Sequence, residues 1–479
     1  MTSHDQILAR LASLREADAP THGGRVLSYV YDSGRADLDE LAAAAVRAMQ
    51  PVNGLDPTTF SSVATLEREL VGFVRGLLHG GADVVGTVTT GGTESCLLAV
   101  KTARDLWLGA RGREPGAARP KLVAPVTVHA AFQKAAHYFG LELVLVPVLE
   151  SGAVDPAAIE AELADDVALV VVSAPNYPFA ALDPVEAVAA LGAARDIPVH
   201  VDACIGGLVL PFWPDLPEWD FAVPGVTSIS ADLHKFGYSP KGVSVLLQRG
   251  RDRQRTQYFA TTRWPGYPVV NPTILGSKSA GPLAAAWAIT EALGVDGFAE
   301  LAASCLRSTR ALRDAIDGIE GLRVVGEPVG PLLAVATDDS VAEDRRVDPH
   351  QWADAVRASG WVLQLQPGIG GMPPTTHLTI TPVTEAGLPE LVPTLVAGAD
   401  GVRGVPHVDA APLLAGLPPL EGALDSETAW ALLQGFGIGG GGVLPDRLAP
   451  LLALIEVLPA PLAERLLTEL LARLVEPLA

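Results

Sequence analysis

The chain has 479 residues, of which 49% are hydrophobic and 19% are charged. This is a globular composition, long enough for roughly two to four domains. A balance of 34 Lys+Arg against 55 Asp+Glu gives a formal net charge of -21, which argues against nucleic acid or an anionic membrane surface as a partner, because both require clustered cations.

The N-terminal 18 residues lack the apolar core of a signal peptide and have the pattern of an amphipathic helix. The apolar residues predicted to face inward are Ile7, Leu8, Leu11 and Leu14. Three cysteines, Cys96, Cys204 and Cys305, stand at unrelated spacings without a CxxC pair. We therefore expect reduced thiols and a cytoplasmic protein. No apolar run approaches the ~18 residues of a membrane span, so no integral membrane segment is expected.

Between residues 84 and 250, short β-branched runs alternate with Ala/Leu-rich helical segments, a pattern typical of a parallel sheet covered by helices. The expected strands are residues 84–89, 122–128, 143–148, 168–173, 198–202, 228–231 and 243–247. The sequence thus predicts an α/β fold whose large domain holds a mainly parallel seven-stranded sheet.

A long helical stretch over residues 281–319 is followed by a segment with a different spacing of apolar residues, which predicts a small α+β domain. Its expected elements are a helix over 351–358 and strands over 322–325, 332–336, 361–366 and 378–381. After residue 401 a Pro/Gly-rich linker precedes leucines at helical spacing, which predict a helix packed on the body or on a partner subunit. The predicted organisation is an N-terminal segment, a large domain, a small domain and a helical extension, with bounds 1–80, 81–280, 281–400 and 401–479.

Ligands of open α/β sheets bind beyond the carboxyl ends of the strands, so polar residues that follow the predicted strands are candidate site residues. The first set is Thr89-Thr90-Gly91-Gly92-Thr93-Glu94-Ser95, where glycines allow close backbone approach and the first helical turn offers free N–H groups to an anion. This is a candidate phosphate cradle without a Walker lysine. A simple helix N-cap with a tight turn explains the same residues.

Three further candidates follow later strands. His129 begins a helix and Asn176 lies in a loop, and either residue can be purely structural. Asp202 ends an apolar strand, where a buried carboxylate is costly unless it is paired; a protonated heterocyclic nitrogen would pair it. The alternative is that Asp202 caps the next turn.

Lys235 lies 33 residues after Asp202 and also follows a predicted strand. A partly desolvated amine at that edge is a nucleophile toward aldehydes, although most lysines are surface residues. A phosphate cradle, an imidazole, a buried aspartate and this lysine together are the parts that hold pyridoxal 5'-phosphate. The combination, rather than any one residue, predicts that cofactor.

At this point the chain resembles the sphingosine-1-phosphate lyases, within the group II decarboxylases that depend on pyridoxal phosphate and share the fold of aspartate aminotransferase. The matching strings are TTGGTES (89–95), HAAFQKAAHYFG (129–140), IPVHVDACIGG (197–207), GVTSISADLHKFGYSPKG (225–242) and WPGYPVVNPTILGSKSAG (264–281). The resemblance extends over about residues 24 to 400.

The resemblance implies a role for each matching residue. Lys235 is the implied Schiff-base lysine, Asp202 the partner of the pyridinium nitrogen, and His129 the imidazole stacked on the ring. The residues implied to contact the cofactor elsewhere are Gly92, Thr93, Asn176, His234 and Ser277. Lys241 is implied in proton transfer and Tyr31 matches the active-site tyrosine. Ser277 is further implied to reach the cofactor of the neighbouring subunit in a homodimer.

Two departures from the family pattern concern the substrate. Where the lyases carry Asn-Pro-Leu-His, this chain has Asn53-Gly54-Leu55-Asp56, and their Phe-Pro-His is replaced by a tripeptide that begins at Tyr177. Asn53, Asp56 and Tyr177 are therefore the candidate substrate residues. Because a carboxylate repels a nearby phosphate, we expect phosphorylated sphingoid bases to be poor substrates.

Three functions remain open on these residues. The first is a carbon–carbon lyase that cleaves an amino-alcohol or amino-acid type of small molecule by retro-aldol chemistry. The second is an L-amino acid decarboxylase on the same scaffold, which also needs Lys235. The third is a non-catalytic protein that binds pyridoxal phosphate, which the intact pair of Asp202 and Lys235 disfavours.

Overall fold

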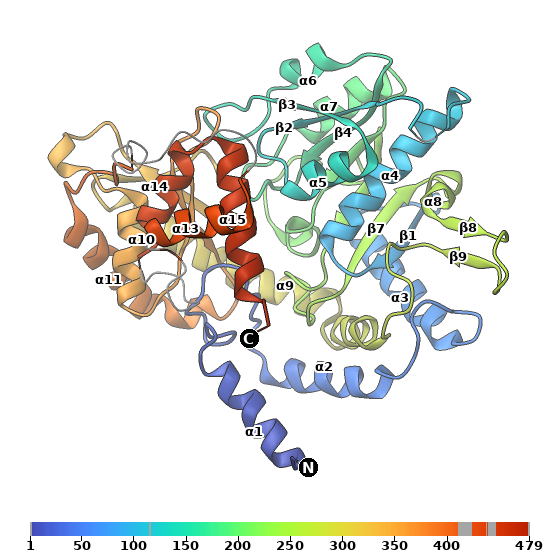
Figure 1. The fold of residues 1–479 in the computed structure, drawn as a ribbon, viewed down its shortest axis with the longest axis horizontal. Coiled ribbons are helices and arrows are strands. Elements are labelled where there is room, and N and C mark those ends of the chain that lie inside the picture. Colours follow the sequence, from blue (N-terminus) through green and yellow to red (C-terminus); the bar gives the residue numbers. More distant parts are fainter. Residues whose placement is uncertain (1, 115, 411–423, 437, 439–446, 478–479) are drawn as a thin grey trace. The chain divides into compact units, whose positions relative to one another are not determined.

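The structure is a computed structural model that describes residues 2–114, 116–410, 424–436, 438 and 447–477. The chain divides into two compact units, whose helices and strands are labelled in Figure 1. Unit 1 comprises Met1–Ala311, Val325–Leu333 and Thr379–Leu388. Unit 2 comprises Leu312–Val324, Ala334–Leu378 and Pro389–Ala479.

Unit 1 contains a seven-stranded sheet in the order β1-β7-β6-β5-β4-β2-β3. The strands β6, β5, β4, β2 and β3 run parallel to one another, whereas β7 is antiparallel to both β1 and β6. The bounds are β1 Val84–Thr89, β2 Lys121–Pro125, β3 Glu142–Val146, β4 Val167–Ser173, β5 Val199–Asp202, β6 Val226–Ala231 and β7 Ser244–Arg249. The predicted α/β fold with a mainly parallel sheet is confirmed. The largest difference is at β2, which ends at Pro125 instead of residue 128.

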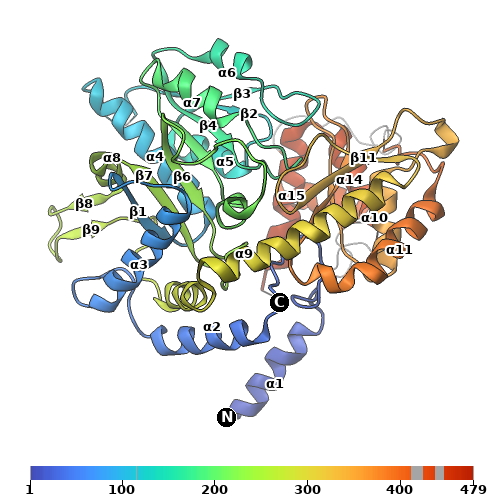
Figure 2. The same ribbon diagram turned by 180° about the vertical axis from the view of Figure 1, so that it is seen from behind.

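Helices cover both faces of this sheet, as the views from opposite sides in Figures 1 and 2 illustrate. Alternate residues of β4 enter two different core clusters, Val170 and Val172 in one and Leu169 and Val171 in the other. The first cluster also contains residues of α3 Ser61–Leu77, α7 Val185–Ala193 and α9 Gly281–Asp317. The second contains residues of α4 Gly92–Ala110 and α5 Ala130–Phe139. Strands buried on both sides explain the continuous apolar runs in the sequence.

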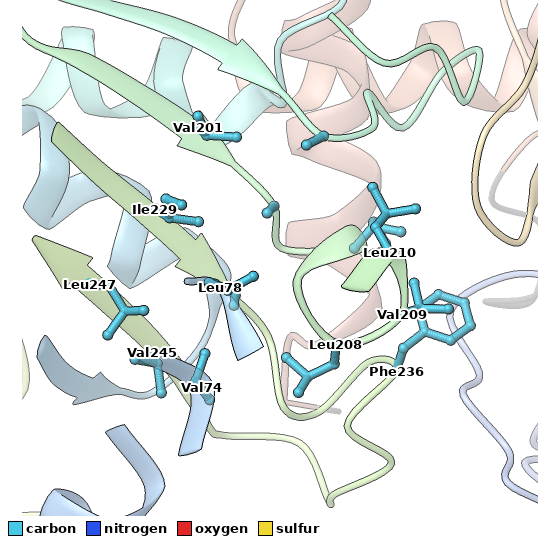
Figure 3. Packing of buried hydrophobic residues seen from close by; sticks show 14 of the residues in the cluster. Val74, Leu78, Val201, Leu208, Val209, Leu210, Ile229, Phe236, Val245 and Leu247 are labelled. Atoms are coloured by element: carbon cyan, nitrogen blue, oxygen red, sulfur yellow. The ribbon is translucent and has the colours of Figure 1, made fainter. Parts of the chain in front are cut away.

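Figure 3 shows part of the first cluster. Val74 of α3 and Leu78, which follows this helix, belong to the same cluster as Val201 of β5, Ile229 of β6 and Val245 of β7. Phe236, which directly follows Lys235, is fully buried in the same cluster. Burial of a residue of this size contributes roughly 1.5–3 kcal/mol, so the segment that carries Lys235 is anchored by its neighbour.

The remaining elements of unit 1 are shorter or peripheral. They are α1 His4–Arg15, α2 Ala36–Met49, α6 Pro156–Glu162, α8 Arg251–Gln257, the 3-10 turns Gly206–Leu208 and Leu210–Phe212, and the hairpin of β8 Phe259–Thr261 with β9 Val269–Asn271. Helix α9 is interrupted at Gly294, whose φ of 55° and ψ of -171° are not helical. Glycine tolerates this backbone conformation, which accounts for the break at that position.

Helix α1 forms as predicted, but the prediction that its apolar residues face inward is wrong. The helix begins with a capping box between Ser3 and Gln6 and has no buried residue. The exposed fraction is 48% to 63% for the side chains of Ile7, Leu8, Leu11 and Leu14. Helical spacing determines which residues share a face, but it does not determine whether this chain covers that face.

Unit 2 contains a four-stranded sheet in the order β10-β11-β13-β12 and five helices among its described residues. The bounds are β10 Leu322–Val324, β11 Leu332–Thr337, β12 Gln364–Gln366, β13 Thr375–Thr379, α10 Pro349–Ala358, α11 Thr384–Val402, α13 Ser426–Gly435, α14 Ala449–Val457 and α15 Ala460–Leu474. Two strands differ from their predicted bounds. Strand β12 begins at Gln364 instead of residue 361, and β13 ends at Thr379 instead of residue 381.

The leucines predicted to form a packed helix near the C-terminus lie in α15, and only part of the stripe is buried. Leu466 and Leu470 join a cluster with α13 and α14, whereas Leu467, Leu471 and Leu474 are exposed. Among the described residues, no helix has the length and apolarity needed to cross a membrane.

Buried Asp183, in the loop after β4, gives a stability prediction. Its two carboxylate oxygens accept separate hydrogen bonds from the backbone N–H groups of Val154 (3.0 Å) and Ser173 (2.8 Å). An asparagine has only one such oxygen, so Asp183→Asn is expected to lower the free energy of unfolding by about 1–3 kcal/mol in denaturant titrations. Asp155→Asn is the control, since asparagine caps a helix as well as aspartate and should cost less than about 0.5 kcal/mol.

The same variant should alter the pH dependence of stability. Burial raises the pKa of Asp183 to about 6, against weaker opposing effects of the two hydrogen bonds. Because the pKa of Asp183 is higher in the folded than in the unfolded protein, its contribution to the free energy of unfolding is present in acid and is lost as the pH rises through about 6. The destabilisation by Asp183→Asn should therefore be about 1 kcal/mol smaller at pH 8 than at pH 5. An equal loss at both pH values would contradict this assignment.

Candidate active site

Asp202 is the buried carboxylate at the end of β5. One of its oxygens accepts hydrogen bonds from the Cys204 backbone N–H (3.1 Å) and the Ser230 hydroxyl (3.2 Å). Burial acts to raise its pKa, but the nearby His129, Cys204 and Lys235 outweigh it and hold the pKa below the usual value. Asp202 therefore presents a negative charge at the carboxyl edge of the sheet.

Lys235 follows β6 and forms an ion pair with Asp232, with 3.0 Å between Nζ and Oδ2. The Asp232 side chain is 1% exposed and that of Lys235 is 20% exposed. Burial acts to lower the pKa of Lys235, but Asp232, followed by Tyr31, raises it well above the usual value. Asp232 was missed as a site residue by the sequence analysis, although its position three residues before the lysine at a strand end was an available signal.

The glycine turn before α4 lies directly against Asp232. A Cβ atom on Gly92 would stand 2.6 Å from Asp232 Oδ2 and 2.9 Å from Cys204 Sγ, so only glycine fits there. Gly91 has a φ of 152°, and a Cβ on it would lie 3.3 Å from His234. The next residue, Thr93, is exposed in the first turn of the helix. The turn is thus closely packed against the lysine segment, beneath an accessible helix N-terminus.

Glu94 belongs to the predicted phosphate cradle, but the sequence indicated no separate role for its carboxylate. One of its oxygens accepts hydrogen bonds from the backbone N–H (2.7 Å) and hydroxyl (2.8 Å) of Thr90. The other accepts from the backbone N–H groups of Ile274 (2.7 Å) and Leu275 (3.2 Å). Glu94 therefore connects the glycine turn to the loop before Ser277.

Two phenols and a second lysine surround Lys235. Burial raises the pKa of Tyr31 to about 12, and burial followed by the neighbouring Tyr31 also raises the pKa of Tyr177. The Lys241 Nζ lies 4.6 Å from the centroid of the Tyr31 ring and donates a hydrogen bond to the His234 carbonyl oxygen (3.2 Å). Burial, followed by the charge of Lys235, lowers the pKa of Lys241 to about 8. Near neutral pH the phenols hold their protons and Lys241 is close to its titration point.

His129 and Asn176 lie in the segments after β2 and β4, and both side chains form local hydrogen bonds. His129 is the N-cap residue of α5, and its Nδ1 accepts a hydrogen bond from the Ala131 backbone N–H (3.1 Å). The Asn176 side chain donates to the Gly152 carbonyl oxygen (2.9 Å) and accepts from the Phe179 backbone N–H (3.1 Å). Asn176 is thus engaged in its own loop, and the cofactor roles of both residues stay predictions.

Asn53, Asp56 and Ser277 form contacts of their own. Asn53 donates a hydrogen bond to the Ser277 hydroxyl (3.4 Å), and Asp56 accepts from the backbone and hydroxyl groups of Thr58 and Thr59. Within the described part of the chain, no hydrogen bond or ion pair of these three side chains reaches Lys235. Their predicted roles toward substrate and partner subunit stay predictions.

The arrangement fits pyridoxal 5'-phosphate at both of its polar ends. Asp202 offers the charge that a protonated ring nitrogen requires, and Lys235 offers an amine to the aldehyde. At the other end, His234 Nδ1 is buried and has no hydrogen-bond partner among the described residues. Buried polar atoms are usually satisfied, so this nitrogen and the exposed first turn of α4 are consistent with an anionic ligand beside the glycine turn.

Comparison with known proteins points to the same group of enzymes. Residues 51–335 match the family described as "Pyridoxal-dependent decarboxylase conserved domain", and residues 408–473 match "Pyridoxal-dependent enzyme, C-terminal putative HTH domain". Sphingosine-1-phosphate lyase 1 of Rattus norvegicus is 36% identical over 361 residues, which cover 74% of this chain and 61% of that protein. The chain thus spans about three fifths of the length of this relative.

Two solved structures extend the comparison. Sphingosine-1-phosphate lyase from Burkholderia pseudomallei superposes with a TM-score of 0.76 at 31% identity, covering 84% of this chain and 90% of that one. Glutamate decarboxylase from Lactobacillus brevis has a TM-score of 0.75 at 18% identity, covering 85% and 94%, a likeness of fold alone. The chain therefore belongs to the pyridoxal-dependent decarboxylase family, as a member similar to the sphingosine-1-phosphate lyases.

Proposed function

We propose that this chain is a carbon–carbon lyase that uses pyridoxal phosphate bound through Lys235 to cleave an amino-alcohol or amino-acid type of substrate. The observation that carries the proposal is the buried, charged group at one sheet edge: Asp202 at the end of β5, and Lys235 held 3.0 Å from Asp232 after β6. The 31% identity to a solved sphingosine-1-phosphate lyase supports retro-aldol cleavage over decarboxylation.

In this proposal each residue of the chain has a separate task. When bound, the cofactor supplies an electron sink for the bond that breaks. Asp202 would hold the protonated ring nitrogen through its negative charge, and Asp232 orients the Lys235 amine. Tyr31 Oη holds its proton because its pKa is raised to about 12, whereas Lys241 Nζ, with a pKa of about 8, is suited to accept or release one.

The reaction type is tested by the products. Purified holoenzyme is incubated with β-hydroxy amines, phosphorylated or not, and with L-amino acids, while aldehyde and carbon dioxide are measured. The proposal expects aldehyde release from a β-hydroxy amine. Carbon dioxide release from an L-amino acid would support the decarboxylase alternative, and neither product from protein that has bound cofactor would support the non-catalytic one.

Substrate choice gives a further prediction at Asp56. Hydrogen bonds from Thr58 and Thr59 lower the pKa of Asp56, so the carboxylate is charged at neutral pH. In this proposal Asp56 faces the substrate, so Asp56→His should increase kcat/KM for sphingosine 1-phosphate several-fold, because it removes a negative charge that repels the substrate phosphate. Glu186→His, at an exposed position of α7, is the charge-matched control. Efficient cleavage of sphingosine 1-phosphate by the unmodified enzyme would contradict the prediction.

We extend the proposal to a cytoplasmic homodimer. Exposed apolar side chains support a partner surface, both on α1 and on the β8–β9 hairpin and the loop after it, where Phe259, Trp264, Tyr267 and Ile274 are 47% to 66% exposed. Three free, buried cysteines agree with a reducing compartment. Light scattering of the purified holoenzyme should give twice the 49.8 kDa chain mass, and a monomer would contradict the dimer.

A further inference from the structure

A cluster of two histidines and a glutamate lies in unit 2, apart from the chemistry of Lys235. His350 is in the first turn of α10, His407 follows α11, and Glu456 is near the end of α14. One potential ligand atom from each of the three lies within 4.8 Å of the other two. The imidazole rings have centroids 5.6 Å apart. Three separate segments of the chain therefore converge on one point.

The hydrogen bonds of His350 determine which of its nitrogens is available. Its Nε2 lies 2.9 Å from the carbonyl oxygen of Gln366, which can only accept, so Nε2 carries the proton. Nδ1 then has a free lone pair, and it is buried without a hydrogen-bond partner among the residues that the structure describes. The His350 side chain is fully buried. A buried, unpaired lone pair is uncommon unless a cation or a donor reaches it.

The other two side chains are oriented in the same way by outer partners. His407 Nδ1 lies 2.7 Å from Asp348 Oδ2, and its Nε2 lies 2.8 Å from Glu456 Oε2. The second Glu456 oxygen accepts a hydrogen bond from the Gly368 backbone N–H (2.9 Å). Histidines that bind metals typically donate their other N–H to a carboxylate or a carbonyl, and carboxylate ligands are also hydrogen-bonded. All three groups have this second layer of contacts.

We propose that His350 Nδ1, His407 Nε2 and a carboxylate oxygen of Glu456 form a binding site for a divalent transition-metal ion of the zinc type. Two imidazoles and a carboxylate suit Zn²⁺ or Co²⁺, whereas Ca²⁺ and Mg²⁺ prefer oxygen ligands. Binding replaces the proton on His407 Nε2, which passes to the solvent, and leaves Nδ1 donating to Asp348.

The site would connect α14 to α10, which already contact each other at Asp354. The Asp354 carboxylate accepts hydrogen bonds from the backbone N–H groups of Leu448 (2.9 Å) and Ala449 (3.0 Å) at the start of α14. The metal would add a second connection near the other end of that helix. His407 also lines a surface cavity of about 760 Å³ with Asp348 and Pro349, through which an ion can approach.

The test is a titration of metal-free, untagged, full-length holoenzyme with CoCl₂, followed by visible absorption and by the thermal unfolding midpoint. One equivalent of Co²⁺ should bind, produce the absorption of a low-symmetry site and raise the unfolding midpoint. His407→Gln and Glu456→Gln should each weaken binding at least about tenfold. His22→Gln is the matched control, because this exposed histidine also contacts a carboxylate, Asp39, but lies outside the cluster; its affinity should be unchanged.

Two results would overturn the proposal. One is no Co²⁺ binding by the unmodified protein, in which case His407 is an imidazolium between two carboxylates. The other is unchanged binding in both His407→Gln and Glu456→Gln, which would place the metal elsewhere. Among the described residues the thiol cluster of unit 1, Cys96 and Cys204 with Asp202, is another group of potential ligands, and loss of Co²⁺ binding in Cys204→Ser would identify it as the site.

Discussion

Replacing Lys235 with alanine is expected to reduce turnover by at least about a thousandfold, equivalent to about 4 kcal/mol at the transition state. The physical reason is that no other amine takes its place: the Lys235 Nζ lies 3.0 Å from buried Asp232, and the neighbouring Lys241 is hydrogen-bonded to the His234 carbonyl oxygen. The measurement is steady-state aldehyde release from the best substrate found in the product assay.

A surface lysine provides the control for this variant. Lys121 forms an ion pair with Asp166 at the start of β2, and Lys121→Ala should leave turnover unchanged. The assignment of Lys235 would be contradicted if Lys235→Ala, with its fold verified by circular dichroism, retained more than about a tenth of the normal rate.

Asp202→Asn is expected to lower kcat by about 10²–10⁴-fold, or roughly 3–5 kcal/mol, while leaving the fold intact. The amide oxygen can still accept the hydrogen bonds from the Cys204 N–H and the Ser230 hydroxyl, so the local structure is retained. What is lost is the negative charge beside the ring nitrogen. Stopped-flow or steady-state kinetics, together with a thermal unfolding curve, separate the two effects.

Asp220→Asn is the matched control for Asp202. Asp220 is also buried in unit 1, where it accepts hydrogen bonds from the Ala222 backbone N–H and contacts His79. This substitution should affect stability without a comparable loss of turnover. A near-normal rate in Asp202→Asn would mean that Asp202 only caps the following turn, as the alternative reading of the sequence holds.

The large sheet was predictable because its strands are encoded locally. The apolar run that became β4 is buried on both faces, so no alternation with polar residues was needed to recognise it. Strand direction is not encoded in the same way: β7 is antiparallel to β6, and only pairing across the sheet determines this. The apolar face of α1 is a similar case, because the spacing of apolar residues in the sequence does not show which surface, if any, packs against that face.

The candidate site was predictable to the extent that its residues follow strands. Asp202, Lys235 and Gly92 were found from their positions at strand ends, and the structure brings them close together. Asp232 also follows a strand, so its position was an available signal, but its role depends on a 3.0 Å contact with Lys235 that forms only in the folded chain. His350 and His407 are 57 residues apart and Glu456 is 49 further on, so no local spacing could have revealed their convergence.

Lys235 is expected to carry the cofactor, and reduction of the holoenzyme with borohydride followed by peptide mapping tests this assignment. The holoenzyme should be yellow, lose its visible absorption on reduction and yield one pyridoxyl-labelled peptide containing Lys235. A label on another lysine, such as Lys241, or no label on protein that retains its cofactor, would contradict it.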